Sequence, residues 1–162
     1  MGIFCAFLCA VLVHEGGHIA AAYFCGVPVR CLRLGAIGFR LRIDYSAVSY
    51  GRELAILLAG SAAGLLGAWM AYLCGWSDAV LYHLALSGCN LLPVQGLDGG
   101  AALEVLLTMR FLPDTACRIA RAFSFVTVVA LWIAVVWICM RVQVNLGLLL
   151  TALWFLLGHL RC

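Results

Sequence analysis

The sequence predicts an all-α, polytopic membrane protein with about five transmembrane helices and a short β-hairpin at the membrane surface between the first two. Of its 162 residues, 66% are hydrophobic and 10% are charged, so water cannot be the main solvent of the fold. Apolar runs of about 20 residues recur, and each is long enough as a helix to cross a hydrocarbon core of roughly 30 Å. This length leaves room for one membrane-embedded domain, residues 1–162.

Cysteine and arginine usage excludes several other classes. The nine cysteines include no Cys-x-x-Cys pair and lie mostly in apolar runs, which indicates small hydrophobes and not a disulfide framework. The net charge of +3 is too small to predict nucleic-acid binding. The first apolar run has no basic residue before it and no small-residue cleavage site after it, so no removable signal peptide is expected. Met1 is expected to start the mature chain, or a core that lacks a preceding helix.

The first helix is predicted over 3–24 and a strand-like segment follows it. The helix pattern ends before Pro28. From Phe39 to Tyr45 apolar and polar residues alternate, which is typical of a strand, and 30–34 is a weaker partner with a turn at 35–38. The open edge of this strand could pair with an unwound peptide; the alternative is an amphipathic surface element that binds anionic lipid.

Two further helices precede a break in the apolar pattern. The helix predicted over 53–73 carries the small-residue run 60–64, which permits close helix contact in lipid. The next is predicted over 77–92, capped by Ser77 or Asp78, and is interrupted at Pro93. A shorter amphipathic helix, 101–110, follows.

The last two helices are predicted over 117–140, after a turn at Pro113 and Asp114, and over 146–160. Because arginine is enriched in cytoplasmic loops, the arginines also predict the orientation. All except Arg141 lie in the loop between the first two helices, around the turn before 117, or at the C-terminus. These parts are therefore predicted to face the cytosol, with the N-terminus outside.

The first helix contains His14, Glu15, Gly16, Gly17 and His18, an H-E-x-x-H pattern. Residues four apart share a helical face, so both imidazoles can reach one zinc ion with Glu15 beside it as general base. A chance match to this short pattern is the alternative. It is disfavoured because a charged residue near the bilayer centre costs at least roughly 2.5 to 3.5 kcal/mol, so three ionisable residues within five positions indicate a function. Each glycine costs about 1 kcal/mol relative to alanine in a helix, which predicts close approach of another backbone.

A catalytic zinc site normally has a third protein ligand, and Asp98 is the best placed acid. It follows the broken helix, and irregular backbone at membrane depth is allowed where it lines protein or a wet cavity. Taken alone, Asp98 would be an N-cap of the helix 101–110. Asn90 could bind a substrate carbonyl or oxyanion, although an interhelical hydrogen bond explains it nearly as well. His83 and His159 lack a spaced partner and are interpreted as structural.

Two stretches resemble signature motifs of the site-2 intramembrane metalloproteases. Residues 14–18 match the family's H-E-x-x-H, and 90–99 match its N-x-x-P-x-x-x-x-D-G. Residues 58–61, Leu-Ala-Gly-Ser, are similar to the family's L-A-G-P, with Ser61 in place of proline. The resemblance covers about 8–107, so that the helices over 117–140 and 146–160 are accessory.

The resemblance implies one zinc ion per chain held by His14, His18 and Asp98, with Glu15 catalytic and Asn90 assisting. It implies an intramembrane zinc endopeptidase that cleaves in or next to a transmembrane segment of a membrane-tethered substrate. The nearest branch is the sporulation type, stage IV sporulation protein FB-like, because the PDZ and nucleotide-sensing domains of other branches are absent. The resemblance suggests pro-sigma or anti-sigma factor processing in a bacterial cell membrane and a regulatory membrane subunit, and the arginine-based topology predicts an active site towards the cytosolic side. That branch normally has six membrane helices and a regulatory tail, and by this comparison the sequence is expected to lack the first helix and the tail.

Two other classes remain as alternatives. A membrane metal transporter should show several coordinating residues spaced along a permeation path, whereas the sequence shows one cluster and one partner. A catalytically silent adaptor could keep a zinc site for structure, but such a site has no use for Glu15.

Overall fold

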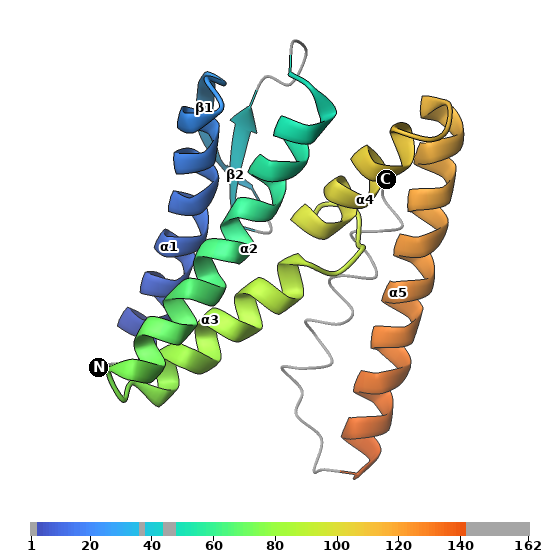
Figure 1. The fold of residues 1–162 in the computed structure, drawn as a ribbon. Helices are drawn as coiled ribbons and strands as arrows, with labels where there is room; N and C mark the ends of the chain where they lie inside the picture. The colour runs from blue at the N-terminus through green and yellow to red at the C-terminus, as the bar shows by residue number, and fades with distance from the viewer. Residues whose placement is uncertain (1–2, 36–37, 44–47, 142–162) are drawn as a thin grey trace.

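The computed structural model describes residues 3–35, 38–43 and 48–141. This part of the chain forms five helices and one two-stranded antiparallel sheet (Figure 1). In chain order the elements are α1 (Ile3–Phe24), β1 (Val29–Gly35), β2 (Gly38–Ile43), α2 (Tyr50–Leu73), α3 (Ser77–Asn90), α4 (Asp98–Thr108) and α5 (Pro113–Arg141).

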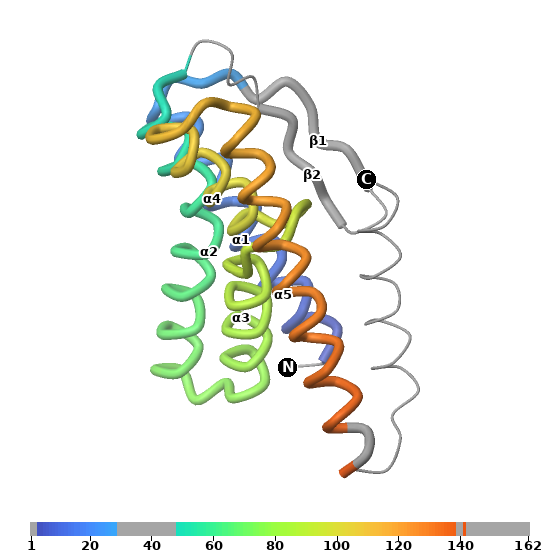
Figure 2. The backbone as a smooth tube through the Cα atoms, turned by 90° about the vertical axis from the view of Figure 1, so that its right-hand side faces the viewer, coloured from blue at the N-terminus to red at the C-terminus, as the bar shows by residue number. Residues whose placement is uncertain are grey.

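Helices α1, α2 and α3 pack against one another, and α4 connects them to α5 (Figures 1 and 2). Helix α1 contacts both α2 and α3, while α4 packs on α2 and on α5. Helices α1 and α3 run in one sense and α2 in the other, as the sequence predicts. The end of α3, the start of α4 and the middle of α1 are thereby brought to the same part of the molecule.

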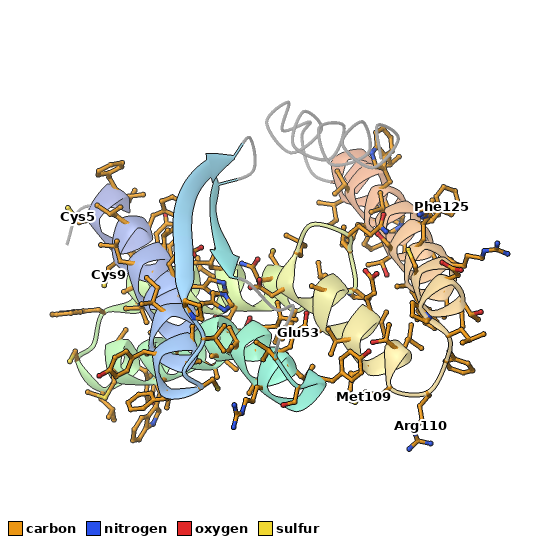
Figure 3. All side chains as sticks on the ribbon, turned by 90° about the horizontal axis from the view of Figure 1, so that it is seen from above. Cys5, Cys9, Glu53, Met109, Arg110 and Phe125 are labelled. Atoms are coloured by element: carbon orange, nitrogen blue, oxygen red, sulfur yellow. The ribbon has the colours of Figure 1, made fainter. Side chains whose placement is uncertain are left out.

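Helices α1, α2 and α5 are long and apolar enough to cross a membrane. Large apolar side chains on them face outward, among them Phe4, Trp69 and Phe125, the last labelled in Figure 3. Such surfaces are stable in lipid, which indicates an integral membrane protein. Three of the five predicted membrane spans are thus confirmed as long apolar helices. Helix α3, with 14 residues, is shorter than the roughly 20 that a full span needs. The fifth predicted span, 146–160, lies outside the described residues.

Between α1 and α2 the backbone forms two antiparallel strands. Leu34 pairs with Phe39 and Leu32 with Leu41, and the register shifts between Val29 and Cys31. The strand was expected to continue to Tyr45, which lies outside the described residues. The position of these strands at a membrane surface stays a prediction.

Helix α5 begins four residues earlier than the predicted 117, and Pro113 is its first residue, not part of a turn. Proline suits this position because an N–H in the first turn has no partner within the helix, so nothing is lost when it is missing. The fixed φ of proline is also helical. Asp114 lies in the same turn, where a carboxylate is stabilised by the positive end of the helix dipole. The predicted turn at Pro113 is therefore wrong, because the proline is the first residue of the helix.

The boundaries of α2 and α3 also differ from those predicted. Helix α2 begins at Tyr50, three residues before the predicted start at 53. Helix α3 ends at Asn90, and Trp76 occupies its N-cap position without a side-chain bond, so Ser77 and Asp78 are both inside the helix. The N–H groups of the first turn are left to partners other than a capping side chain. The start of such a helix cannot be predicted from the positions of capping residues.

The contact between α1 and α2 depends on Gly17. A Cβ atom added there would lie 2.6 Å from both the carbonyl oxygen of Ala59 and the Cβ of Ala63. The predicted close approach of another backbone is confirmed for Gly17. It is wrong for Gly16, where an added Cβ meets no atom within 4 Å in the described part of the chain. These two adjacent glycines therefore have different roles, and only Gly17 sets the helix spacing.

Replacing the two glycines separately tests this assignment. We expect Gly17→Ala to lower the free energy of unfolding by about 1 to 3 kcal/mol, because the methyl group overpacks the interface. Gly16→Ala should raise it by up to about 1 kcal/mol through helix propensity. Unfolding by SDS titration in mixed micelles measures both. Equal effects of the two substitutions would contradict the assignment.

Candidate metal site

His14 and His18 lie on the buried face of α1. The buried residues of this helix recur every four positions over most of its length, namely Ala6, Ala10, His14, His18 and Ala22. The stripe faces the neighbouring helices, so its two polar members are removed from lipid, with 3% of His14 and 7% of His18 exposed. Their rings lie edge to face with centroids 4.9 Å apart. The spacing of four thus places both imidazoles side by side, as predicted.

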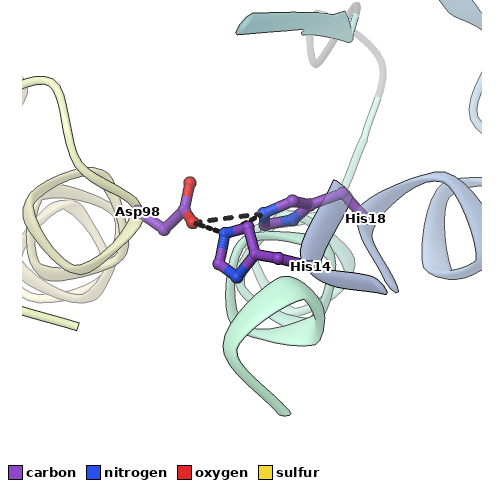
Figure 4. Close-up of side chains that lie close together, drawn as sticks. All are labelled: His14, His18 and Asp98. Atoms are coloured by element: carbon purple, nitrogen blue, oxygen red, sulfur yellow. Dashed lines mark hydrogen bonds and ion pairs between the residues drawn. The ribbon is translucent and has the colours of Figure 1, made fainter. Parts of the chain in front are cut away.

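Asp98 meets these histidines from the opposite side (Figure 4). Its Oδ2 atom lies 3.0 Å from Nε2 of His14 and 3.1 Å from Nε2 of His18. The two Nε2 atoms are 3.3 Å apart. Asp98 is the first residue of α4, and Leu97 occupies the N-cap position, so the alternative of an N-cap at Asp98 is wrong. The carboxylate is directed towards α1 instead of capping its own helix.

The three side chains fit a metal ion by their chemistry and their spacing. One atom from each, two imidazole nitrogens and a carboxylate oxygen, can serve as a ligand, and these atoms all lie within 4.8 Å of one another. Tetrahedral zinc with bonds of about 2.0 Å separates its ligand atoms by about 3.3 Å. The separations of 3.0, 3.1 and 3.3 Å are close to that value. Two histidines and a carboxylate, with a position left open, are a donor set typical of catalytic zinc.

The backbone of α2 fixes the orientation of His18. Nδ1 of His18 lies 2.8 Å from the carbonyl oxygen of Ile56, and since a carbonyl can only accept, Nδ1 is the donor. In the neutral ring Nε2 then carries the lone pair that a metal requires. His14 differs, because its buried Nδ1 has no hydrogen-bond partner in the described part of the chain.

Gly60 of α2 makes room for the His18 ring. A Cβ atom added at Gly60 would collide with Nε2 of His18 and would lie 2.6 Å from Cδ2 and Cε1. The ring therefore occupies the space of the missing side chain. The small-residue run 60–64 indicated a close helix contact, but the neighbour at its first position is a side chain of the site.

Two glycines let Asp98 reach this position. Cβ atoms added at Gly99 and Gly100 would collide with the backbone of the preceding loop, at the carbonyl oxygens of Leu91 and Val94 respectively. The start of α4 therefore folds directly onto the end of α3. This explains in physical terms why an Asp-Gly-Gly sequence follows the broken helix.

Glu15 and Asn90 differ in their relation to the three ligand candidates. Glu15 is half-buried, and its carboxyl group interacts electrostatically with His18, His14 and Asp98. Asn90 uses its amide nitrogen to donate a 3.0 Å hydrogen bond to the carbonyl of Leu86. That bond is within α3, and within the described residues no hydrogen bond joins Asn90 to the histidines or Asp98. The amide nitrogen of Asn90 therefore donates within its own helix, and this bond is not the interhelical one that the sequence suggested as an alternative.

The two remaining histidines stay apart from the site. His83 is buried between α3 and α2, where a Cβ atom added at Gly67 would lie 2.5 Å from its ring. It belongs to no group that could hold a metal among the described residues. His159 lies outside the described residues. The structural interpretation of His83 agrees with its place against a glycine of α2.

Comparison with known proteins adds a relation of fold. The chain is similar to the solved structure of a site-2 protease from Methanocaldococcus jannaschii, with a TM-score of 0.73 and 22% sequence identity. The similarity covers 98% of this chain and 76% of the other. The chain has the fold of a site-2 protease. No protein-family model and no curated protein matches it. At this identity the relation establishes the site-2 protease fold, and the chemistry rests on the residues of this chain.

A methyl group at Gly60 should disrupt the candidate site. We expect Gly60→Ala to weaken zinc binding by about 10- to 100-fold, the range found when groups that orient metal ligands are altered, because the His18 ring must move. Competition with a fluorescent zinc chelator measures the affinity. Gly51→Ala is the matched control in the same helix, since a Cβ added at Gly51 meets no atom within 4 Å among the described residues. Unchanged affinity in Gly60→Ala would show that this ring position is not needed for metal binding.

Proposed function

We propose that this chain is a member of the site-2 protease family and acts as an intramembrane zinc endopeptidase. Its substrate would be a membrane-tethered protein, cleaved in or next to a transmembrane segment. The observation that carries the proposal is the convergence of His14, His18 and Asp98 inside a bundle of apolar helices. The site-2 protease fold of the chain supports it.

The residues have distinct roles in this proposal. His14, His18 and Asp98 would hold zinc, which when bound supplies a Lewis acid for the peptide carbonyl and acidifies a water molecule. Glu15 would accept the proton of the attacking water and later donate it to the leaving amine. Asn90 retains a second N–H, because its amide group has two and only one is bonded to Leu86, and this donor would bind the substrate carbonyl.

Access to the site imposes a requirement on the substrate. The carbonyls of a membrane helix are engaged in internal hydrogen bonds, so the cleaved segment must unwind locally. An unwound segment exposes N–H and C=O groups that β2 or β1 could bind through a free edge, since the two strands form a sheet of their own. The arginine distribution favours cleavage on the cytosolic side. The resemblance to the sporulation-type branch is the basis for proposing pro-sigma or anti-sigma factor processing in a bacterial membrane, with a regulatory membrane subunit.

The described residues give little support to a transporter. Among them a single group of His, Cys, Asp and Glu side chains lies close enough together to hold a metal. A permeation path would need further polar positions along its length. An adaptor with a structural zinc site stays open to experiment, and Glu15 is the residue that separates it from a protease.

Zinc content tests the three-ligand site directly. We expect close to one zinc per chain in detergent-purified wild-type protein, and loss or strong weakening in Asp98→Ala, because two histidines alone leave the metal short of a ligand. Elemental mass spectrometry measures the ratio. Asp114→Ala is the control, since Asp114 also lies in the first turn of a helix but away from this group. Absence of zinc from the wild type, or full retention without Asp98, would reject the site.

Glu15→Gln separates catalysis from metal binding. We expect the variant to keep its zinc and to lose at least about 100-fold in cleavage rate, because glutamine cannot accept the proton. The assay uses single-span reporter proteins with glycine or proline in the span, reconstituted with the enzyme in liposomes. Glu104→Gln, which removes a carboxylate from α4 outside the site, is the control. Absence of cleavage by the wild type would favour the adaptor, whereas equal cleavage by wild type and Glu15→Gln would reject Glu15 as the general base.

A further inference from the structure

The loop between α3 and α4 determines where Asp98 lies, and its own bonds are few. Within it the N–H of Val94 donates to the carbonyl of Leu92 at 2.7 Å, and that of Leu97 to the carbonyl of Val94 at 3.0 Å. Gly96 has a φ of +94°, which glycine adopts far more readily than other residues. A loop of two tight turns needs contacts from outside to hold a carboxylate in one place.

One such contact comes from α5. The backbone N–H of Gln95 donates a 2.8 Å hydrogen bond to Oγ of Ser124. Gln95 precedes Asp98 by three residues, whereas Ser124 follows Gln95 by 29 residues. Ser124 is fully buried, with 0% of its surface exposed. Because this bond is partly buried and joins a helix to a loop backbone, it restricts the loop more than a contact at a solvent-exposed position would.

Ser124 occupies a distinctive place on α5. Buried residues recur on this helix at every fourth position: Ala116, Ala120, Ser124 and Val128. Ser124 is the polar member of this row, and it lies where the row meets the loop. An alanine would continue the row as well by size, but it would leave the N–H of Gln95 without this acceptor.

We propose that Ser124 is a positioning residue that holds the loop before Asp98 and thereby sets the place of this metal ligand. The inference rests on the proposed zinc site. It assigns a role in that site to α5, which contributes none of the three ligand candidates. Groups that orient metal ligands from outside the coordination sphere typically change metal affinity 10- to 100-fold when removed.

The test combines zinc affinity with amide exchange in the full-length protein in detergent. We expect Ser124→Ala to bind zinc about 10-fold more weakly in chelator competition. In the metal-free protein, the amide of Gln95 should exchange with deuterium faster than in the wild type, as followed by mass spectrometry of a peptide spanning 91–97. Ser124→Thr keeps the hydroxyl and should restore both properties. Thr127→Val is the control on the same helix, because the hydroxyl of Thr127 donates to the carbonyl of Phe123 within α5 and not to the loop.

The outcomes separate this inference from the proposed function. Wild-type affinity in Ser124→Ala, with or without faster exchange, would overturn the positioning role while leaving the zinc site intact. Equal losses in Ser124→Ala and Ser124→Thr would also overturn it, because the effect would then come from packing and not from the hydroxyl. Wild-type protein that binds no zinc would reject the proposed function. Independently of zinc, unchanged exchange of the Gln95 amide in Ser124→Ala would reject the contact between Ser124 and the loop.

Discussion

The close approach of α1 and α2 is the constraint on which the candidate site depends. Gly17 allows the two backbones to approach, and Gly60 then receives the His18 ring in the space where a side chain would lie. At this separation the carbonyl of Ile56 can accept the proton of Nδ1, which orients the ring. In lipid, where apolar surface gains little from helix association, small residues of this kind supply the contact area that holds helices together. The same contact therefore stabilises the fold and prepares a ligand.

The break between α3 and α4 supplies the other half of the site. A continuous helix after Asn90 would extend past α1 and would carry residue 98 about 12 Å further along its axis. The break instead folds the chain back, and Gly99 and Gly100 pack directly on the backbone of the loop. Asp98 then reaches the histidines from a second direction. Irregular backbone inside a membrane domain is tolerated where it lines protein or a wet cavity, and in this loop Val94 is buried while Leu91 and Gly96 are exposed.

Much of this arrangement could be predicted from the sequence because it depends on local spacing. The four-residue separation of His14 and His18, and the break at Pro93, are visible without any tertiary information. The partner of each glycine is not, and Gly16 was wrongly given the role that Gly17 has. Pro113 shows the same limit, since proline both ends and starts helices and only the contacts of the following turn decide between them. The contact of Ser124 with Gln95 has no local signal at all.

Burial of a polar side chain in this bundle does not by itself indicate a metal site. His83 is as buried as His14, and it lies against Gly67 much as His18 lies against Gly60. Ser87 adds another buried hydroxyl on the same face of α3, against Gly64. The glycines of α2 therefore accommodate polar groups in general. What distinguishes His14 and His18 is a carboxylate equidistant from both, delivered by a different helix, so that three donors face one point. That convergence, more than the burial of any one histidine, is the physical basis for assigning metal chemistry to the middle of α1.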